Sequence, residues 1–304
     1  MDYNEFREEI LRELQKRHGD GLEITVSRIK KNNGAGYYGV KFQSQNTGEG
    51  VTLGAVFRLD HLYEAYAGGE MDTAACAESL WEEYEKNREP EDLQQFAEDL
   101  QRWDTARKNI YPVLLSAEKN ADMLPELVTV PVLDLAVVFI VRGRVSGSGC
   151  STVKVTAAML EDYKVSGKEL YDAAMANLED DGYSFQSMDD IIRDILKKEN
   201  AGNTGLDLPG EIKMYVLSNA SKTYGAAGIL SRKLVREFAN GRDMYILPSS
   251  VHETIFVPVS DKYSAMELSR MVEDINRTQV ALEERLADHC YFYDAKADEI
   301  RIEP

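Results

Sequence analysis

The segment with the greatest chemical potential is the run PSSVHE, which places two hydroxyls, an imidazole and a carboxylate at positions 249–253. A serine becomes a nucleophile when an adjacent base accepts its proton, and His252 is near enough in sequence to serve Ser249 or Ser250. Triad members usually come from separate loops, however, and Pro-Ser-Ser between two apolar runs is ordinary turn chemistry. Three alternatives therefore remain for Ser249, Ser250, His252 and Glu253: a structural turn, a binding surface, or the active centre of a small hydrolase or transferase.

A second polar segment, SNASKTY at 218–224, lies between two predicted strands. Polar loops on a rigid sheet are favoured places for binding, but an Asx-turn at Asn219 explains the composition more simply. If 212–218 runs up and 226–230 runs down, a helix from Ser231 returns the chain to the top before 244–247 descends. This topology predicts that Asn219 and His252 lie at opposite ends of the sheet and share no site.

Sequence fingerprints of common enzymes are missing. The chain contains no GxxxxGK[ST], GxSxG or HExxH motif, and its four histidines lie in distant segments. Glycine-rich stretches at 33–36 and 143–149 lack the helix start that a phosphate loop needs, so they predict hairpin turns. We expect no cofactor and no bound metal.

The charge balance restricts the class of partner. Lys and Arg number 35 against 53 Asp and Glu, which gives a formal net charge of −18. Phosphate binding depends on clustered Lys and Arg, and the pairs at 30–31 and 142–144 are too short to supply it. We therefore expect a protein or small-ligand partner, and neither nucleic acid nor a membrane; an acidic surface suits a basic partner or simple solubility.

Cysteine usage and the first residues indicate the compartment. Cys76, Cys150 and Cys290 are far apart with no CxxC pair, which is typical of free thiols in a reducing cytoplasm. The opening MDYNEFREEI is acidic rather than basic and apolar, so no secretory signal is expected. The longest apolar stretch, 133–141, contains Asp134 and is far shorter than the roughly 20 residues that span a bilayer.

Hydrophobic periodicity predicts the elements of the first 124 residues. Spacings of three and four predict a helix over 2–18, and period-two alternation then predicts a three-stranded meander ending near residue 57. Residues 59–120 have helical spacing, with a kink or new start at Pro112. A domain of helix, meander and helical layer is therefore expected over 1–124.

Residues 125–304 show a repeated plan of strand, turn, strand and helix. One copy is 212–218 with 226–230 and a helix from Ser231; another is 244–247 with 253–257 and a helix from Ser264; a longer copy begins at 133. Ser264 with Glu267, Ser166 with Glu169 and, more weakly, Ser187 with Asp190 have capping-box spacing. Two short strands close the chain at 291–293 and 300–302, and 199–210 is a polar linker. Strands paired by short turns predict an α+β fold with an antiparallel sheet.

The apolar positions of these strands predict one buried group in a single C-terminal sheet, since continuous or alternating apolar runs face a core. Its members are Leu135, Val137, Phe139, Val216, Leu217, Ile246 and Ile255.

The chain resembles a family of uncharacterised bacterial proteins, DUF5688, found in anaerobic gut Gram-positives. The matching stretches are LDLAVVF (133–139), MYVLSN (214–219), YGAAGIL (224–230), MYILPSSVHE (244–253), NRTQV (276–280) and YFYDAKADEIRI (291–302). A second uncharacterised family is similar over 212–258 only. The resemblance implies a cytoplasmic bacterial protein without an assigned activity, and it carries over no catalytic residues.

The residues and the resemblance together predict a non-enzymatic cytoplasmic protein that binds a partner or ligand. The alternative is a small hydrolase or transferase that uses Ser249, Ser250 and His252.

Overall fold

The structure, a computed structural model, describes residues 1–18, 21–44, 56–87, 91–145, 149–198 and 213–303. The chain forms two compact units: residues 1–106 with 143–151, and residues 107–142 with 152–304. The division into domains after residue 124 stays a prediction, whereas the compact units divide after residue 106.

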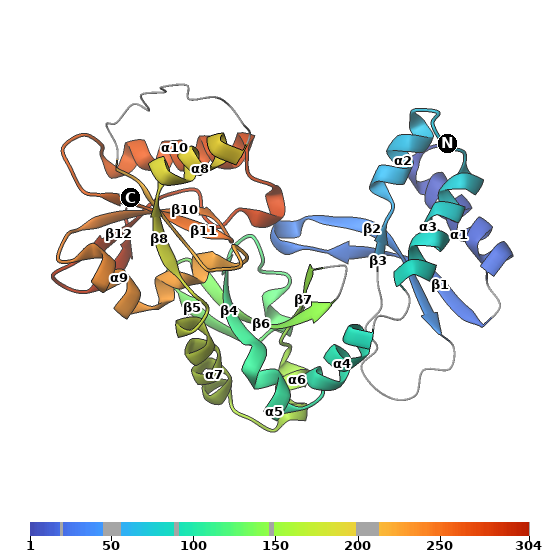
Figure 1. Cartoon of the computed structure of the whole chain (residues 1–304), viewed down its shortest axis with the longest axis horizontal. Helices are drawn as coiled ribbons and strands as arrows, with labels where there is room; N and C mark the ends of the chain where they lie inside the picture. The colour runs from blue at the N-terminus through green and yellow to red at the C-terminus, as the bar shows by residue number, and fades with distance from the viewer. Residues whose placement is uncertain (19–20, 45–55, 88–90, 146–148, 199–212, 304) are drawn as a thin grey trace. The chain divides into compact units, whose positions relative to one another are not determined.

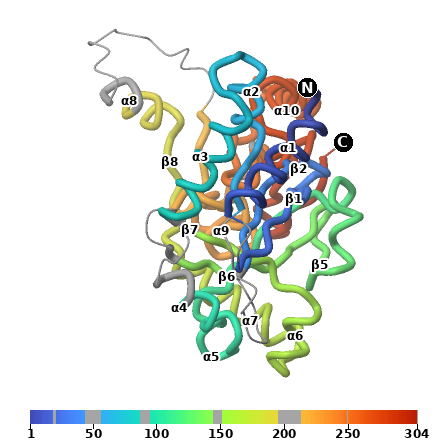
Figure 2. The backbone as a smooth tube through the Cα atoms, turned by 90° about the vertical axis from the view of Figure 1, so that its right-hand side faces the viewer, coloured from blue at the N-terminus to red at the C-terminus, as the bar shows by residue number. Residues whose placement is uncertain are grey.

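The first unit begins with the predicted helix and meander. Helix α1 (Tyr3–His18) is followed by β1 (Leu22–Lys30), the short η1 (Asn32–Gly34), β2 (Gly36–Ser44) and β3 (Val56–Arg58), which form an antiparallel sheet in the order β1-β2-β3. One stripe of α1, formed by Phe6, Ile10 and Leu14, is fully buried in the core of this unit. In Figure 2, α1 lies against β1 and β2. Residues 51–55 of the predicted third strand lie outside the described residues.

Four helices follow β3, as the helical spacing predicted: α2 (Asp60–Ala67), α3 (Thr73–Asn87), α4 (Glu91–Leu100) and α5 (Trp103–Ala106). Leu62, Cys76 and Leu80 on α2 and α3 are buried together with the α1 stripe. Burial of such side chains contributes about 1.5–3 kcal/mol each, so this shared core holds helices and meander together.

The predicted helical run is wrong at its end. After η2 (Arg107–Asn109), residues Ile110–Ser116 form strand β4, not a kinked helix. Pro112 pairs in register with Phe139 of β6. β4 ends the order β4-β6-β5, and proline is tolerated on an edge strand because its missing N–H faces away from the sheet.

The second sheet of the chain contains β4, β5 (Thr129–Val132), β6 (Leu135–Val145) and β7 (Gly149–Lys154), with η3 (Leu124–Glu126) before β5. Helices α6 (Ala157–Tyr163) and α7 (Gly167–Glu179) follow, and α7 begins at the predicted capping box of Ser166 and Glu169. Asn177 of α7 donates through Nδ2 to the carbonyl of Ile110 at 2.8 Å, which fixes the helix on β4.

The third sheet has the antiparallel order β13-β12-β10-β11-β9-β8. Its strands are β8 (Ser184–Ser187), β9 (Tyr215–Ser218), β10 (Met244–Ser250), β11 (Glu253–Pro258), β12 (Tyr291–Asp294) and β13 (Glu299–Ile302). Helix α8 (Met188–Lys198) follows β8, where Ser187 Oγ accepts from Asp190 N at 3.1 Å as the weaker capping spacing predicted.

Two helices cover opposite faces of this sheet (Figure 1). Val257 of β11 packs with Leu268 of α10 (Ala265–Thr278), which starts at the predicted Ser264 capping box. The neighbouring Phe256 points to the other face, where its ring meets Phe238 of α9 (Arg232–Ala239). Alternate residues of one strand thus serve two helical layers.

The prediction of repeated strand-turn-strand-helix units is correct for β10, β11 and α10 but wrong for the preceding unit. Residues Gly225–Leu230 form a short 3-10 helix, η4, in place of the second strand. Its first five residues are all buried, and a Cβ on Gly228 would lie 2.7 Å from the Tyr183 ring. Glycine and alanine are poor strand formers, and here their small size lets the backbone pack closely on neighbours.

The residues of the predicted buried group lie in two different sheets and not in a single sheet. Leu135, Val137 and Phe139 lie on β6, while the other four lie on β9, β10 and β11. All are buried except Ile255, which is half-buried. The prediction of apolar burial was therefore right for six of the seven residues, and the prediction of a single sheet was wrong.

The cysteines yield a direct test. Cys76 and Cys290 are buried free thiols, and burial raises the pKa of each, so both resist reaction in the folded state. The side chain of Cys150 lies outside the described residues. Thiol titration of unfolded protein prepared without reductant should find all three thiols; one thiol or none would contradict the predicted reducing compartment.

Among the described residues, no helix combines the length and apolar character needed to cross a bilayer.

Candidate functional site

The loop after β9 and the turn between β10 and β11 lie together at one end of the third sheet. β9 pairs antiparallel with β11, with Leu217 opposite Thr254, so the end of β9 is beside the start of β11. Ser218 Oγ donates to the carbonyl of His252 at 2.8 Å. The prediction that Asn219 and His252 lie at opposite ends of the sheet is therefore wrong. Residues 225–230 form η4 and not a strand that returns the chain to the other end, so the next strand runs in the direction opposite to the one predicted.

The turn that contains the candidate site residues is stabilised locally. Ser250 and Glu253 are opposite each other in the β10–β11 register, and Ser250 Oγ accepts from His252 N at 3.0 Å. Ser250 is 9% exposed and Glu253 is half-buried. Ser249 belongs to β10, and its side chain lies outside the described residues. Ser250 thus acts as a turn residue whose hydroxyl bonds the nearby backbone.

The two nitrogens of the His252 imidazole face two different segments. Its Nδ1 accepts from the backbone N–H of Tyr224 at 3.1 Å, and its Nε2 lies 3.5 Å from Glu284 Oε1. In the neutral ring an accepting Nδ1 requires the proton on Nε2, which then faces the carboxylate. Neither nitrogen is hydrogen-bonded to Ser250 Oγ within the described part of the chain, so this arrangement does not form a Ser250–His252 nucleophile and base.

A third segment, η5 (Leu282–Glu284), completes the site, and it was not predicted from the sequence. The carbonyl of Glu284 accepts from Val251 N at 2.8 Å, so backbone bonding fixes the segment against the turn. The side chain of Glu284 is 43% exposed. No sequence spacing connects Glu284 to His252, because the connection depends on how α10 returns the chain.

The Ser218–Tyr224 loop is closed by Asn219, but its backbone bond reaches residue i+4 and not residue i+2, which the predicted Asx-turn requires. Asn219 Oδ1 accepts from Thr223 N and from Ser221 Oγ, each at 3.1 Å. Lys222 and Tyr224 have positive φ angles of 52° and 56°. Residues other than glycine rarely adopt this conformation, and such strain is concentrated at functional sites.

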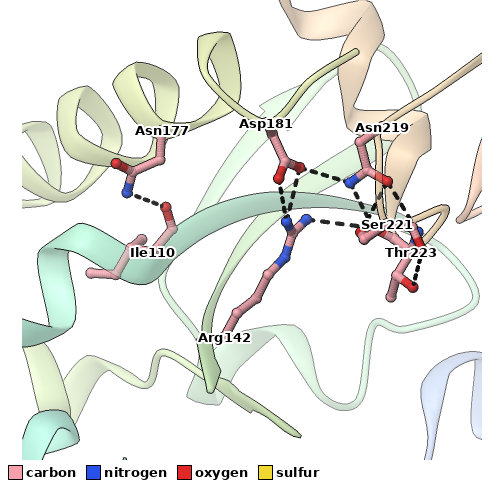
Figure 3. A network of polar contacts seen from close by, with 7 residues as sticks. All are labelled: Ile110, Arg142, Asn177, Asp181, Asn219, Ser221 and Thr223. Carbon is pink, nitrogen blue, oxygen red and sulfur yellow. Dashed lines mark hydrogen bonds and ion pairs between the residues drawn. The ribbon is translucent and has the colours of Figure 1, made fainter. Parts of the chain in front are cut away.

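A polar network anchors this loop to the second sheet (Figure 3). Arg142 at the end of β6 donates to both carboxylate oxygens of Asp181, at 2.7 and 2.8 Å, and its guanidinium lies 3.8 Å from the centre of the Tyr111 ring. Asp181 Oδ2 also accepts from Asn219 Nδ2 at 2.7 Å. Burial, followed by the negative charge of Asp181, raises the pKa of Tyr183 well above its usual range.

Gly225 marks the closest approach of the loop and the turn. A Cβ at this position would lie 2.5 Å from the carbonyl oxygen of His252 and 2.9 Å from Asn219 N, and closer still to Ser218 Oγ. Only glycine fits here, so the close approach of the loop and the turn requires a glycine at position 225.

We call the segments 218–225, 250–253 and 282–284 the loop junction. Among its described side chains, hydrogen bonds join the loop to the turn, and none connects Ser250 Oγ to an imidazole nitrogen of His252. Within the described residues, no group of three or more His, Cys, Asp or Glu side chains is placed to hold a metal ion.

The fold is α+β, and the loop junction brings three segments together at one end of the third sheet. The chain belongs to the family of unknown function DUF5688, whose model matches residues 3–295. No curated protein matches the chain. No solved structure matches it either.

Proposed function

We propose that the protein is a non-enzymatic binding protein and that the loop junction is its binding surface. The observation that carries this proposal is the placement of the His252 ring, whose Nδ1 accepts from Tyr224 N and whose Nε2 lies 3.5 Å from Glu284 Oε1. The hydrogen bond from Tyr224 N orients the ring while its side chain stays 30% exposed, which suits recognition because little conformational freedom is lost on binding.

The strain in the loop supports the same proposal. Lys222 and Tyr224 retain left-handed conformations that each cost of order 1–3 kcal/mol. The Arg142–Asp181–Asn219 network holds the loop in this shape. A loop held in one strained conformation presents its side chains in a fixed pattern to a partner.

We further propose that the protein acts in the bacterial cytoplasm. The free thiols of Cys76 and Cys290 support a reducing compartment.

The test is quantitative capture of partners from an extract of the source organism. His252→Asn keeps an oxygen that can accept from Tyr224 N, so the fold should persist while the ring is lost; thermal unfolding checks this. His61→Asn is the matched control, because His61 is exposed on α2 of the other compact unit. We expect capture of specific partners to fall with His252→Asn and to be unchanged with His61→Asn.

A parallel assay addresses the hydrolase alternative. Wild-type protein, Ser249→Ala, Ser250→Ala and His252→Asn are incubated with a panel of activated esters and amides. We expect no turnover above background from any of them. Turnover by the wild type that disappears in His252→Asn and in either serine variant would contradict the proposal and favour the hydrolase.

A further inference from the structure

Glu284, His252 and Tyr224 bring a carboxylate and two rings, all half-buried, together in the loop junction. The Tyr224 and His252 ring centres are 5.6 Å apart with planes inclined by 31°, and the Glu284 carboxylate lies beside the imidazole at 3.5 Å. A carboxylate at the edge of one of two neighbouring rings can pair with a planar cation that stacks on a ring.

The protein uses this chemistry internally. The Arg142 guanidinium is stacked on Tyr111 while it binds the Asp181 carboxylate. Arg301 repeats the arrangement in the same unit: it lies 4.3 Å from the Phe292 ring centre and pairs with Asp294. In both cases one arginine satisfies a ring and a carboxylate together.

Glu284 differs from Asp181 and Asp294 in its partner. In the part of the chain that the structure describes, the Glu284 carboxylate pairs with His252 Nε2 and with no arginine or lysine. The imidazole supplies at most one hydrogen to one oxygen. A carboxylate oxygen accepts more than one hydrogen bond, so Glu284 keeps capacity for a charged donor.

The surroundings favour a basic and partly apolar partner. Glu253 and Glu283, both half-buried, belong to the loop junction, and Leu282, which precedes Glu283, is 46% exposed. Lys222 on the loop and Arg285 after η5 oppose this charge, although Arg285 Nε is engaged by the Val280 carbonyl at 3.0 Å. The chain as a whole carries −18, so a basic partner is attracted over distance.

We propose that Glu284, together with the His252 and Tyr224 rings, receives an arginine side chain of a protein partner. The inference rests on the proposed binding function and adds the chemistry of the residue recognised. Arginine is favoured over lysine because its flat guanidinium binds a carboxylate and stacks on a ring at once, whereas an ammonium is a compact, strongly hydrated charge.

The test uses three labelled peptides of alternating glycine with arginine, lysine or citrulline, measured by fluorescence anisotropy against the full chain. Citrulline keeps the shape of arginine and removes its charge. We expect the arginine peptide to bind best, the citrulline peptide to lose binding, and the arginine affinity to weaken as salt is raised.

Glu284→Gln is the decisive variant, because the backbone bond from Val251 N to residue 284 is retained and the fold should persist. We expect about a two- to fivefold loss of arginine-peptide affinity, the value of one partly exposed charge pair. Glu299→Gln is the matched control, since Glu299 is exposed on β13 and its loss removes the same charge. Tyr224→Leu, which retains its backbone N–H, should reduce the preference for arginine over lysine.

Equal binding of the arginine and lysine peptides, or equal losses in Glu284→Gln and Glu299→Gln, would overturn the inference. The proposed function fails separately. If partner capture from the extract depends on His252 but not on the Glu284 charge, the loop junction binds something other than arginine; if capture does not depend on His252, the binding function itself is wrong.

Discussion

Replacement of Asp181 with alanine is expected to lower the free energy of unfolding by about 3 kcal/mol, because it leaves Arg142 charged and largely buried without its partner. Both side chains are only 12% exposed, and Asp181 also accepts from Asn219 Nδ2. The loss therefore includes the anchor of the strained loop. Urea unfolding with a two-state analysis measures the change.

An exposed pair in the same unit serves as the control. Lys168 and Asp172 form an ion pair on α7 with side chains 81% and 58% exposed. Asp172→Ala should change stability by less than about 0.5 kcal/mol, since such pairs contribute little in water. Equal effects of Asp172→Ala and Asp181→Ala would show that the Figure 3 network contributes nothing beyond surface charge.

Gly225→Ala is expected to destabilise the protein by about 3 kcal/mol or to prevent folding, since the added methyl group meets two backbone atoms that cannot move independently. Those atoms are the His252 carbonyl oxygen and Asn219 N, at 2.5 and 2.9 Å from the Cβ position. Thermal unfolding followed by circular dichroism measures the loss.

Gly167→Ala provides the matched substitution. Gly167 begins α7, and a Cβ there would have no atom within 4 Å, so alanine should be neutral or slightly stabilising through its helix propensity. If Gly225→Ala were as stable as Gly167→Ala, the close approach of the loop and the turn would be wrong.

The sequence was informative where periodicity, capping and turn chemistry act locally. The α1 stripe, the Ser166 and Ser264 capping boxes and the β10–β11 pair were all predicted from spacings of a few residues. Each depends on neighbours along the chain, so local rules were sufficient.

The errors arose where distant packing decided the outcome. Residues 110–116 contain helix-compatible spacing, but pairing with β6 made them a strand. Residues 226–230 matched a short apolar strand, yet their small side chains let them pack as a 3-10 helix. Because of that second error, the turn between β10 and β11 was predicted at the wrong end of the sheet. His252 was therefore predicted to lie far from the 218–224 loop, whose backbone it contacts.

Some residues of the candidate site were predicted from the sequence and others were not. Ser250, His252 and Glu253 were identified by residue type, and their neighbour Asn219 by turn chemistry. Glu284, Asp181 and Arg142 were not, because each reaches the junction from a segment whose position depends on tertiary structure. Charged residues are common in this acidic chain, and nothing in the local sequence distinguishes these three.

The burial of two asparagines has a practical consequence for the choice of expression host. Asn219-Ala-Ser and Asn276-Arg-Thr are the chain's two acceptor sequences for N-linked glycans. Both side chains are inaccessible, at 4% and 2% exposure, and each amide nitrogen already donates two hydrogen bonds, to Asp181 and Thr223 or to Ala287 and Asp288. A sugar attached to either nitrogen during secretion from a eukaryotic cell would remove those bonds and could not be accommodated inside the fold. Production in a compartment without oligosaccharyltransferase avoids this chemical conflict.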